Sequence, residues 1–441
     1  MRRLSDLIYI SLLLALTPII LYRVLRHGRY KRGLREKLLG LLPRPEKGPD
    51  DIRPLVWFHA VSVGEIIQLQ KVVQQFREDT QDGCEILITT STDSGFDLAS
   101  SRFPDCTVTW FPLDFSWAVS SALRRVNPDL VVLMELELWP GFLSACSARK
   151  VPVAIVNARL SERSCGRYQL IRRWMSPVLS RLALVAAQSP AAAARLRSLG
   201  VRDEVLHVTG SIKFDGVQSD RSNSATTRLR TLLAIPEGAP VLVCGSTQAP
   251  EEQLGLNVWQ QLQQQVPDLH LILVPRHQER FEQVARLVQD SGLTLLRRSA
   301  ADTHTKGSGP RTVRLLDTIG ELGACWGLAD IAFVGGSFGS RGGQNMIEPA
   351  AYGAAVMFGP RTRNFRDVVR ILQDADACRE LADEADFSTA MQELLQDPAR
   401  RNQLGHNAAA VVSSQQGAVN RTSAMLLALL PMNSQRARAA A

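Results

Sequence analysis

Two acids and a lysine stand where predicted strands in the first half of the chain end, and they could carry out proton transfer. Glu65 closes the segment HAVSVGE (59–65), in which a buried strand turns into a helix. Glu135 directly follows an apolar run, and Lys213 lies in GSIKFD (210–215). Open α/β sheets bind ligands at the carboxyl ends of their strands. A carboxylate there can act as a general base, and a lysine can offset charge on an anionic substrate.

Each of these residues also has a structural interpretation. A glutamate in the first turn of a helix, as at Glu65, commonly interacts with the helix dipole. Burial of Glu135 without a partner is costly, so an ion pair or hydrogen bond is expected for it in either case. Lys213 could pair with an acid in a purely structural role. The residue types alone leave both interpretations open.

A glycine-rich loop in the second half predicts a nucleotide site. An apolar run at 331–334 is followed by glycines at positions 335, 336, 339, 342 and 343. Glycine tolerates positive φ and lets a ligand approach the backbone closely. Residues 345–351 then read as the start of a helix, with Glu348 in its first turn, and free N–H groups there attract phosphate. An ordinary strand-to-helix turn with extra glycine is the structural alternative.

Three further loops follow predicted strands of the same half. GST (245–247) is followed by two acids, PRH (275–277) contains Arg276, and DTIGEL occupies 317–322. Arg276 could hold a phosphate by a forked contact. Four loops at the strand ends of one domain carry more weight than any single loop. The chain has no GxGxxG with a downstream acid and no GxxxxGK[ST], which argues against NAD and P-loop ATP chemistry.

Composition and charge narrow the class of protein. With 441 residues, 45% hydrophobic and 21% charged, the chain is globular and long enough for two domains. The net charge of +8 fits an anionic substrate or membrane surface, whereas the 6% aromatic content argues against a nucleic-acid platform. The seven cysteines lack CxxC spacing and read as reduced thiols of a cytoplasmic protein. Neither cysteine nor histidine forms a metal-ligand cluster.

The apolar segments alternate with helical ones and predict two parallel, doubly wound sheets. We expect an N-terminal Rossmann-like domain over 50–215, a linker over 216–236 and a C-terminal Rossmann-like domain with a helical tail over 237–430, with a cleft between the domains. Helices are expected at stretches such as 65–76, 117–126, 169–182 and 387–430. The predicted strands are 55–60, 85–89, 107–111, 130–134, 153–157, 184–187 and 205–209 in the first half, and 241–244, 269–274, 294–296, 313–316, 331–334 and 355–358 in the second.

The first residues predict a membrane anchor. Residues 7–22 are nearly all apolar, and as a helix they would cover roughly 24 Å of a hydrocarbon core about 30 Å thick. No small-residue cleavage site follows, which argues against a signal peptide. Instead a dense basic flank follows, which favours the cytoplasmic side and anionic head groups. Residues 1–28 are therefore expected to hold a cytoplasmic enzyme against the membrane, either spanning the bilayer or lying in its interface.

These motifs together resemble one family, the 3-deoxy-D-manno-octulosonic acid (Kdo) transferases of lipopolysaccharide synthesis. The resemblance runs from the predicted anchor to about residue 367. It implies a GT-B fold of two Rossmann-like domains facing a central cleft, CMP-Kdo as donor, an anionic lipid A precursor as acceptor and no metal or other cofactor. The matching segments, in family order, are HAVSVGE (59–65), ELELWP (135–140), GSIKFD (210–215), GSTQAPEE (245–252), PRH (275–277), DTIGEL (317–322) and GGQNMIEPA (342–350).

The resemblance also implies roles for single residues. It makes Glu65 the catalytic base in an inverting transfer, and it assigns Glu135 and Lys213 to transition-state stabilisation. Two positions depart from the family, which usually has histidine where this chain has Gln248 and Gln344. Glutamine keeps a hydrogen bond but cannot titrate. The positions that match CMP contacts are Pro275, Arg276, Gly320, Glu321, Leu322, Asn345, Met346, Ile347 and Glu348.

The implied partners are CMP-Kdo, the lipid A precursor and a phospholipid surface, with no nucleic acid, at the cytoplasmic face of the inner membrane. Two alternatives remain. One is a GT-B transferase that uses a different nucleotide sugar on a lipid acceptor. The other is a catalytically silent lipid-binding paralogue, which the glutamines at 248 and 344 motivate. A soluble hydrolase or epimerase of the same architecture would leave the basic anchor without a purpose.

Overall fold

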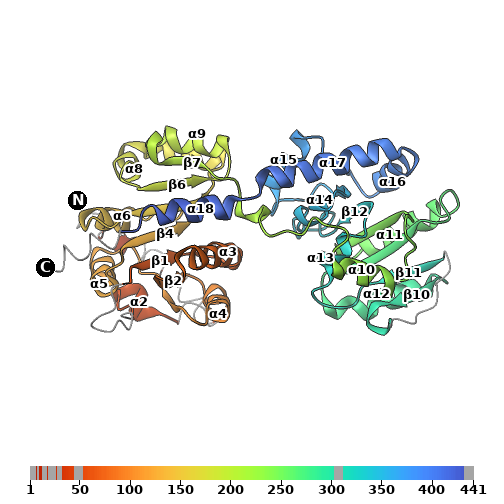
Figure 1. Cartoon of the computed structure of the whole chain (residues 1–441), viewed down its shortest axis with the longest axis horizontal. Helices are drawn as coiled ribbons and strands as arrows, with labels where there is room; N and C mark the ends of the chain where they lie inside the picture. Colours follow the sequence, from red (N-terminus) through yellow and green to blue (C-terminus); the bar gives the residue numbers. More distant parts are fainter. Residues whose placement is uncertain are drawn as a thin grey trace. The chain divides into compact units, whose positions relative to one another are not determined.

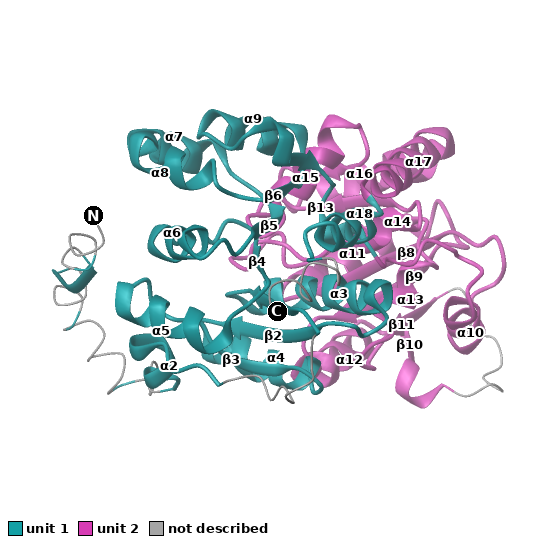
Figure 2. Cartoon of the chain, turned by 60° about the vertical axis from the view of Figure 1, so that its left-hand side comes forward, with its two compact units in different colours: residues 1–215, 416–441 teal, residues 216–415 magenta. Residues whose placement is uncertain are grey.

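The computed structural model describes residues 6, 9–11, 17, 26, 32–43, 53–301 and 311–431 of the chain. The chain divides into two compact units, which Figure 2 draws in different colours. Unit 1 comprises residues 1–215 and 416–441, and unit 2 comprises residues 216–415. Each unit contains one parallel sheet with helices packed on it, as the alternation of apolar segments predicts.

The inner strands of the unit 1 sheet are apolar and buried on both faces. Alternate residues of β1, one of these inner strands, enter two different clusters, with Leu55 and Trp57 in one and Val56 and Phe58 in the other. Such burial explains the continuous apolar runs, because helices cover both faces of a parallel sheet. In the order β3-β2-β1-β4-β5-β6-β7 the strands are Thr107–Trp110, Glu85–Thr90, Leu55–His59, Leu130–Met134, Val153–Ala158, Leu184–Ala187 and Leu206–Val208.

The helices of unit 1 connect these strands and cover the sheet (Figure 1). The longest, α3, begins where Ser62 accepts a hydrogen bond from the backbone N–H of Glu65, an N-cap of the usual kind. The helices are α2 (Leu34–Leu39), α3 (Val63–Thr80), α4 (Asp93–Arg102), α5 (Ser116–Val126), α6 (Pro140–Ala148), α7 (Glu162–Leu170), α8 (Arg172–Leu179), α9 (Pro190–Ser198) and α18 (Ala418–Leu427), with short 3-10 turns η1 (Asp203–Val205) and η2 (Ile212–Phe214).

Helix α18 belongs to a different unit from the one predicted, because the prediction placed all residues from 237 to 430 in the second domain. The structure assigns it to unit 1, where it packs beside α3. The Asp215 carboxylate accepts hydrogen bonds from the backbone N–H groups of Gly417 at 2.5 Å and Val419 at 2.6 Å. Asp215 therefore caps α18 although Gly417, at the start of this helix, lies 202 positions later in the chain. The apolar periodicity of a helix does not indicate to which unit the helix returns, so this could not be predicted from the sequence.

Unit 2 repeats the design with its own sheet and core. Its strands, in the order β10-β11-β9-β8-β12-β13-β14, are Thr294–Arg297, Thr312–Leu315, His270–Pro275, Val241–Thr247, Ile331–Val334, Ala355–Phe358 and Arg379–Glu380. Its helices are α10 (Ser224–Leu232), α11 (Glu251–Leu262), α12 (Phe281–Asp290), α13 (Leu322–Trp326), α14 (Ile347–Ala351), α15 (Arg366–Asp374), α16 (Asp386–Gln396) and α17 (Pro398–Gln415), with 3-10 turns η3 (Gln278–Arg280) and η4 (Arg298–Ala300).

The segment 216–236, expected to be a linker, belongs to unit 2 and contains α10. The buried guanidinium of Arg314 donates hydrogen bonds to the carbonyls of Leu233 at 2.6 Å and Ala234 at 3.0 Å, just after α10 ends. These contacts satisfy carbonyl groups that a helix end leaves without partners. The end of α10 is thereby fixed to the sheet of unit 2.

Two element predictions differ from the structure. The helix expected over 169–182 is instead two helices, α7 and α8, with Ile171 between them at φ −112° and ψ 16°. Strand β14 was not predicted, because two residues are too short for a recognisable pattern. The predicted anchor, residues 1–28, lies almost wholly outside the described residues. Among the helices that the structure does describe, none has both the length and the apolar character of a membrane span.

Candidate active site

Glu65 lies in the first turn of α3, at the carboxyl end of β1, and the residue is 9% exposed. One carboxylate oxygen, Oε2, accepts a hydrogen bond from the backbone N–H of Val61 at 2.9 Å. The other, Oε1, accepts one from the hydroxyl of Ser62 at 2.8 Å. Burial raises the pKa of Glu65 above its ordinary value, and the nearby charge of Glu135 adds to the rise. A carboxylate with a raised pKa is a better proton acceptor.

Glu135 follows β4 with a left-handed backbone, at φ 54°. Its N–H donates to the carbonyl of Val156 at 2.9 Å, which extends the pairing of β4 with β5. Its carboxylate forms an ion pair with Arg159 at 2.9 Å. The electrostatic influence of Glu135 on Glu65 places these two predicted residues near one another. The structural interpretation of Glu135 as an ion-pair partner is thus realised, and its charge also acts on the candidate base.

Glu137 is a third acid at this place, to which the sequence analysis assigned no role. Burial raises its pKa to about 7, and the charges of Glu65 and Glu135 contribute to the rise. The indole N–H of Trp139 donates to it at 3.1 Å, which opposes the rise. The signal was present in ELELWP, where the second acid follows the first by two residues. Residues 65, 135 and 137 together are called the acid cluster below.

Lys213 is half-buried on the turn η2, which packs against α3. A chain of hydrogen bonds connects this turn with the start of α3. The N–H of Ile212 donates to Asn157 at 3.2 Å, and the Asn157 amide donates to Gln68 at 2.7 Å. The Gln68 amide in turn donates to the carbonyl of Gly64 at 3.1 Å. The turn that carries Lys213 is therefore tied to the residue that precedes Glu65.

The predicted loops of unit 2 follow four neighbouring strands. β11, β9, β8 and β12 lie side by side in the parallel sheet, so their carboxyl ends share one edge. DTIGEL follows β11, PRH begins at the end of β9, GST closes β8 and the glycine loop follows β12. The topology thus brings these four segments to one edge of unit 2, as the strand-end argument predicts.

The glycine loop is held by an acid of its own unit. Glu251, at the start of α11 and 1% exposed, accepts hydrogen bonds from the N–H groups of Gly336 at 2.7 Å, Ser337 at 2.9 Å and Phe338 at 3.1 Å. It also accepts one from the N–H of Gln248 at 2.9 Å. The Glu251 carboxylate therefore occupies the concave backbone that these three N–H groups form. The predicted phosphate-attracting N–H groups are those of the helix start at 345–351, which Glu251 does not contact through these bonds.

Gln248 and Gln344, the two positions where the resemblance implies histidine, lie beside the same glycine of this loop. A Cβ atom on Gly336 would meet the Cγ and Nε2 atoms of Gln344 at 3.3 Å and the Nε2 atom of Gln248 at 3.7 Å. Gly336 also has φ 67°, a conformation that favours glycine. The two positions, far apart in the sequence, are thus neighbours over one glycine.

The other predicted nucleotide residues differ in their environments. Arg276 is exposed, and its guanidinium makes no hydrogen bond or ion pair with any residue in the described part of the chain. Glu321 instead forms an ion pair with Arg298 at 2.9 Å and accepts a hydrogen bond from Thr318. Gly320 has φ 89°, beside the exposed side chain of Ile319. Pro275 is buried at the end of β9, and Leu322 opens α13 half-buried.

The short helix α14 begins with a local network. The N–H of Ile347 donates to the side-chain oxygen of Asn345 at 3.1 Å, and the Asn345 amide donates to Glu348 at 2.8 Å. Met346 and Ile347 are buried, whereas Asn345 and Glu348 are half-buried. The polar members of the predicted set are therefore the ones that a ligand could contact through side chains.

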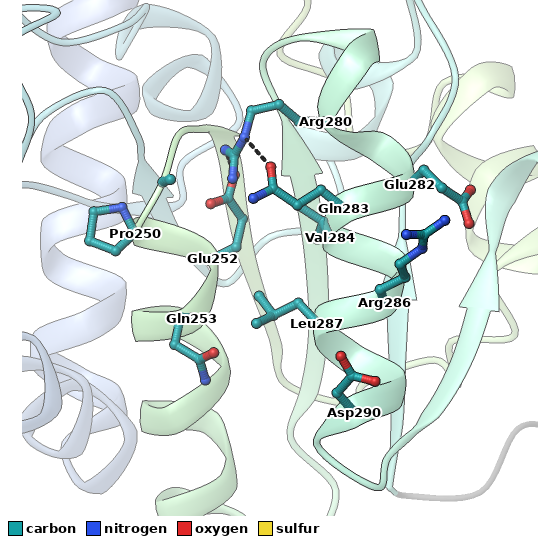
Figure 3. Close-up of a pocket in the computed structure, with 11 residues that line it drawn as sticks. Pro250, Glu252, Gln253, Arg280, Glu282, Gln283, Val284, Arg286, Leu287 and Asp290 are labelled. Carbon is teal, nitrogen blue, oxygen red and sulfur yellow. Dashed lines mark hydrogen bonds and ion pairs between the residues drawn. The ribbon is translucent and has the colours of Figure 1, made fainter.

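A pocket of about 490 Å³ lies in unit 2 between α11 and α12, with the residues that Figure 3 labels around it. At one end the guanidinium of Arg280 pairs with the buried carboxylate of Glu252. The Arg280 Nε–H also donates to Gln283 at 3.4 Å, the dashed line in Figure 3. None of the predicted nucleotide residues lines this pocket. Within the described residues no group of three or more His, Cys, Asp or Glu could hold a metal ion.

Comparisons with known proteins place this arrangement in a family. Residues 30–216 match the model of the 3-deoxy-D-manno-octulosonic-acid transferase (kdotransferase) family. A 3-deoxy-D-manno-octulosonic acid transferase of Haemophilus influenzae is 33% identical over 431 residues, which cover 96% of this chain and 99% of that protein. The chain belongs to the Kdo transferase family. A second Kdo transferase, of Bordetella pertussis, is 35% identical over 390 residues, which cover 85% of this chain and 87% of that protein.

A solved structure extends the comparison to the fold. The UDP-GlcNAc 2-epimerase of Neisseria meningitidis, solved bound to UDP-GlcNAc, superimposes with a TM-score of 0.54 at 14% identity. The match covers 85% of this chain and 99% of that one. At such identity the likeness concerns the fold alone, and it confirms the predicted GT-B class for this Kdo transferase. The predicted cleft and the anchor helix remain predictions.

Proposed function

We propose that the protein is an inverting glycosyltransferase that moves Kdo from CMP-Kdo to a lipid A precursor in lipopolysaccharide synthesis. One observation carries the proposal within the family. Glu65, which corresponds to the family's base, is a buried carboxylate at a strand end, and its pKa is raised above the ordinary range. A group that must accept a proton near neutral pH works best when its pKa lies closer to the operating pH.

The proposed step breaks two bonds and forms two. Glu65 takes the proton of an acceptor hydroxyl as that oxygen attacks the anomeric carbon of Kdo. The bond from this carbon to the phosphate oxygen breaks, and CMP leaves with the electron pair. Glu135 stabilises positive charge that develops on the sugar, and Lys213 offsets negative charge on the departing group. The donor held by unit 2 must reach Glu65 of unit 1, so the reaction requires the cleft that the resemblance implies.

The donor is proposed to bind at the shared strand edge of unit 2. Arg276 supplies a forked cation for the phosphate, and its lack of an ion-pair partner among the described residues supports that role. Asn345 and Glu348 present polar side chains at the start of α14. The full proposed set is Pro275, Arg276, Gly320, Glu321, Leu322, Asn345, Met346, Ile347 and Glu348. No metal is required in this scheme.

The acceptor is proposed to be a lipid, and the enzyme is proposed to work at the cytoplasmic face of the inner membrane. Val63 and Ile67 support an apolar contact near the base, because they flank Glu65 on α3 and are 40% and 47% exposed. The apolar and basic residues at the beginning of the chain, 1–28, are proposed to anchor it.

The test is transfer from CMP-Kdo to a lipid A precursor by the purified chain, with the product identified by mass. Addition of one or more Kdo units is the expected result. One alternative is a different donor, since the neighbouring glutamines at 248 and 344 both lie in the proposed donor unit. Parallel reactions with UDP-sugars address it, and turnover of a UDP-sugar alone would reject the proposal. No turnover of any donor would favour the silent lipid-binding alternative.

A further inference from the structure

The elbow between α7 and α8 exposes an unusual number of large apolar side chains. Leu170 is 86% exposed, Ile171 45% and Trp174 72%. Scattered exposed apolar residues are normal on a soluble protein, but three within five positions at one turn form a patch. Residues 163–174 are called the elbow below. The two helices lie side by side next to α9 (Figure 2).

The elbow is fixed to unit 1 by its inner face. Cys165 and Tyr168, three positions apart on α7, pack against the core of unit 1. The Gln169 amide donates to the hydroxyl of Ser198 on α9 at 2.9 Å. Helix α7 ends and α8 begins at Ile171, and the apolar side chains of Leu170, Ile171 and Trp174 at this break are exposed. The patch is thus presented on a supported structure.

The charged residues of the elbow are all basic. Its sequence, RSCGRYQLIRRW, contains no acid. All four arginines are exposed, and none forms an ion pair with the residues that the structure describes. Arginine beside exposed leucine, isoleucine and tryptophan is the composition of segments that lie in the interface of an anionic bilayer. Tryptophan in particular prefers the level of the head groups. The arginines are Arg163, Arg167, Arg172 and Arg173.

The elbow also lies close to the proposed catalytic residues. Burial and the charge of Glu137 raise the pKa of Tyr168, so Tyr168 lies within electrostatic range of the acid cluster that contains Glu65. Only two positions separate Tyr168 from the exposed Leu170. A lipid acceptor, whose sugar must reach Glu65 while its acyl chains remain in a bilayer, requires the membrane surface to lie near this part of unit 1.

We propose that the elbow is a docking surface for an anionic phospholipid bilayer, with Leu170, Ile171 and Trp174 in the interface and the arginines at the phosphate level. The proposal rests on the proposed function, since only a lipid acceptor gives the enzyme a reason to dock here. It is separate from the predicted anchor, because it concerns a folded surface of unit 1.

The test uses the full chain on vesicles of equal parts phosphatidylglycerol and phosphatidylcholine that carry bromine on the upper acyl chains. Bromine quenches tryptophan emission at short range, and the difference between wild type and Trp174→Phe isolates the emission of Trp174. We expect bromine to remove more than half of this difference. A Trp174 difference that bromine leaves unchanged would overturn the proposal.

Charge variants make the test specific. Each arginine near an anionic surface favours contact by about fivefold, so Arg172→Gln with Arg173→Gln should weaken contact by about thirtyfold at low salt. Arg228→Gln with Arg370→Gln removes equal charge from exposed positions of unit 2 and should leave the quenching unchanged. An equal loss in both pairs would reject a specific docking surface.

Two further outcomes have clear meanings. Trp174 emission that changes with protein concentration without lipid would indicate a second copy of the chain as the occupant and would overturn the proposal. Kdo transfer by a protein whose Trp174 stays unquenched would reject the docking surface and leave the proposed function standing. Quenching without transfer to any acceptor would support the surface and reject the proposed function.

Discussion

Glu65 in unit 1 and Glu251 in unit 2 are both buried acids in the first turn of a helix that follows a strand, but their partners differ. Glu251 accepts hydrogen bonds from four backbone N–H groups, three of which belong to the glycine loop. Glu65 accepts one from a backbone N–H and one from a hydroxyl. Burial raises the pKa of both carboxyl groups.

The difference teaches how a structural acid can be told from a chemical one. The four backbone N–H groups that donate to Glu251 tie this carboxylate to the glycine loop, so its interactions are structural. Glu65 accepts fewer hydrogen bonds, and burial together with the charge of Glu135 raises its pKa, which favours proton uptake. Under the proposed function, the same residue type at an equivalent place in the two units serves two purposes.

The largest expected effect separates the two acids by activity. Glu65→Gln should lower the rate of Kdo transfer by roughly 10²- to 10⁴-fold, because general-base catalysis is lost. Its folding free energy should change by less than about 1 kcal/mol, since the amide keeps an acceptor for the cap. Transfer is measured by product mass and folding by urea titration. Activity within tenfold of the wild-type rate would show that Glu65 is not the catalytic base.

The converse change concerns stability. Glu251→Ala leaves four backbone N–H groups of unit 2 without their acceptor, and we expect a loss of about 3 kcal/mol or more in unfolding free energy. Denaturant unfolding followed by circular dichroism measures it. Exposed Glu204→Ala, in unit 1, is the matched control and should change stability by under about 0.5 kcal/mol. A loss no greater than that of the control would mean that the loop does not depend on Glu251.

The comparison extends to cations of unit 2. Arg276 has no partner among the described residues, whereas Arg280 is paired with Glu252. Arg276→Gln should weaken CMP binding by roughly ten- to hundredfold, because a charge-assisted contact to phosphate is lost. Calorimetric titration with CMP measures the effect, and exposed Arg228→Gln serves as the control. Equal affinities in the two variants would show that Arg276 does not contact the nucleotide.

The smallest effect concerns pH. The pKa of Glu137 is raised to about 7 from 4.5, so between these values the folded protein binds more protons than the unfolded chain. Unfolding free energy should therefore fall as pH rises through this window and level off above it. We expect Glu137→Gln to reduce this slope and to be the more stable protein at pH 8. A variant with the wild-type slope would show that Glu137 titrates normally.

Much of the fold could be predicted because buried parallel strands leave continuous apolar runs, as at 130–134 and 331–334. Local patterns could not reveal the return of α18 to unit 1, which depends on the distant cap at Asp215. The break at Ile171 was missed because neither glycine nor proline marks it.

In the candidate site, too, local sequence features could be predicted and long-range contacts could not. Strand ends and motif residues indicated Glu65, Glu135 and Lys213, and the structure places Glu65 and Glu135 together, with the turn of Lys213 tied to the same helix. The role of Glu251 could not be predicted, because its hydrogen bonds reach residues 85 to 87 positions away. The raised pKa of Glu137 depends on burial, which spacing does not report.

The pH dependence of kcat/KM for transfer from CMP-Kdo tests the central claim, that Glu65 accepts the proton, most directly. The account predicts a rate that falls on the acid side with an apparent pKa above the ordinary carboxyl value of 4.5. It also predicts that the residual activity of Glu65→Gln lacks this acid limb. A wild-type rate that stays constant below pH 4.5, or an acid limb unchanged in Glu65→Gln, would contradict it.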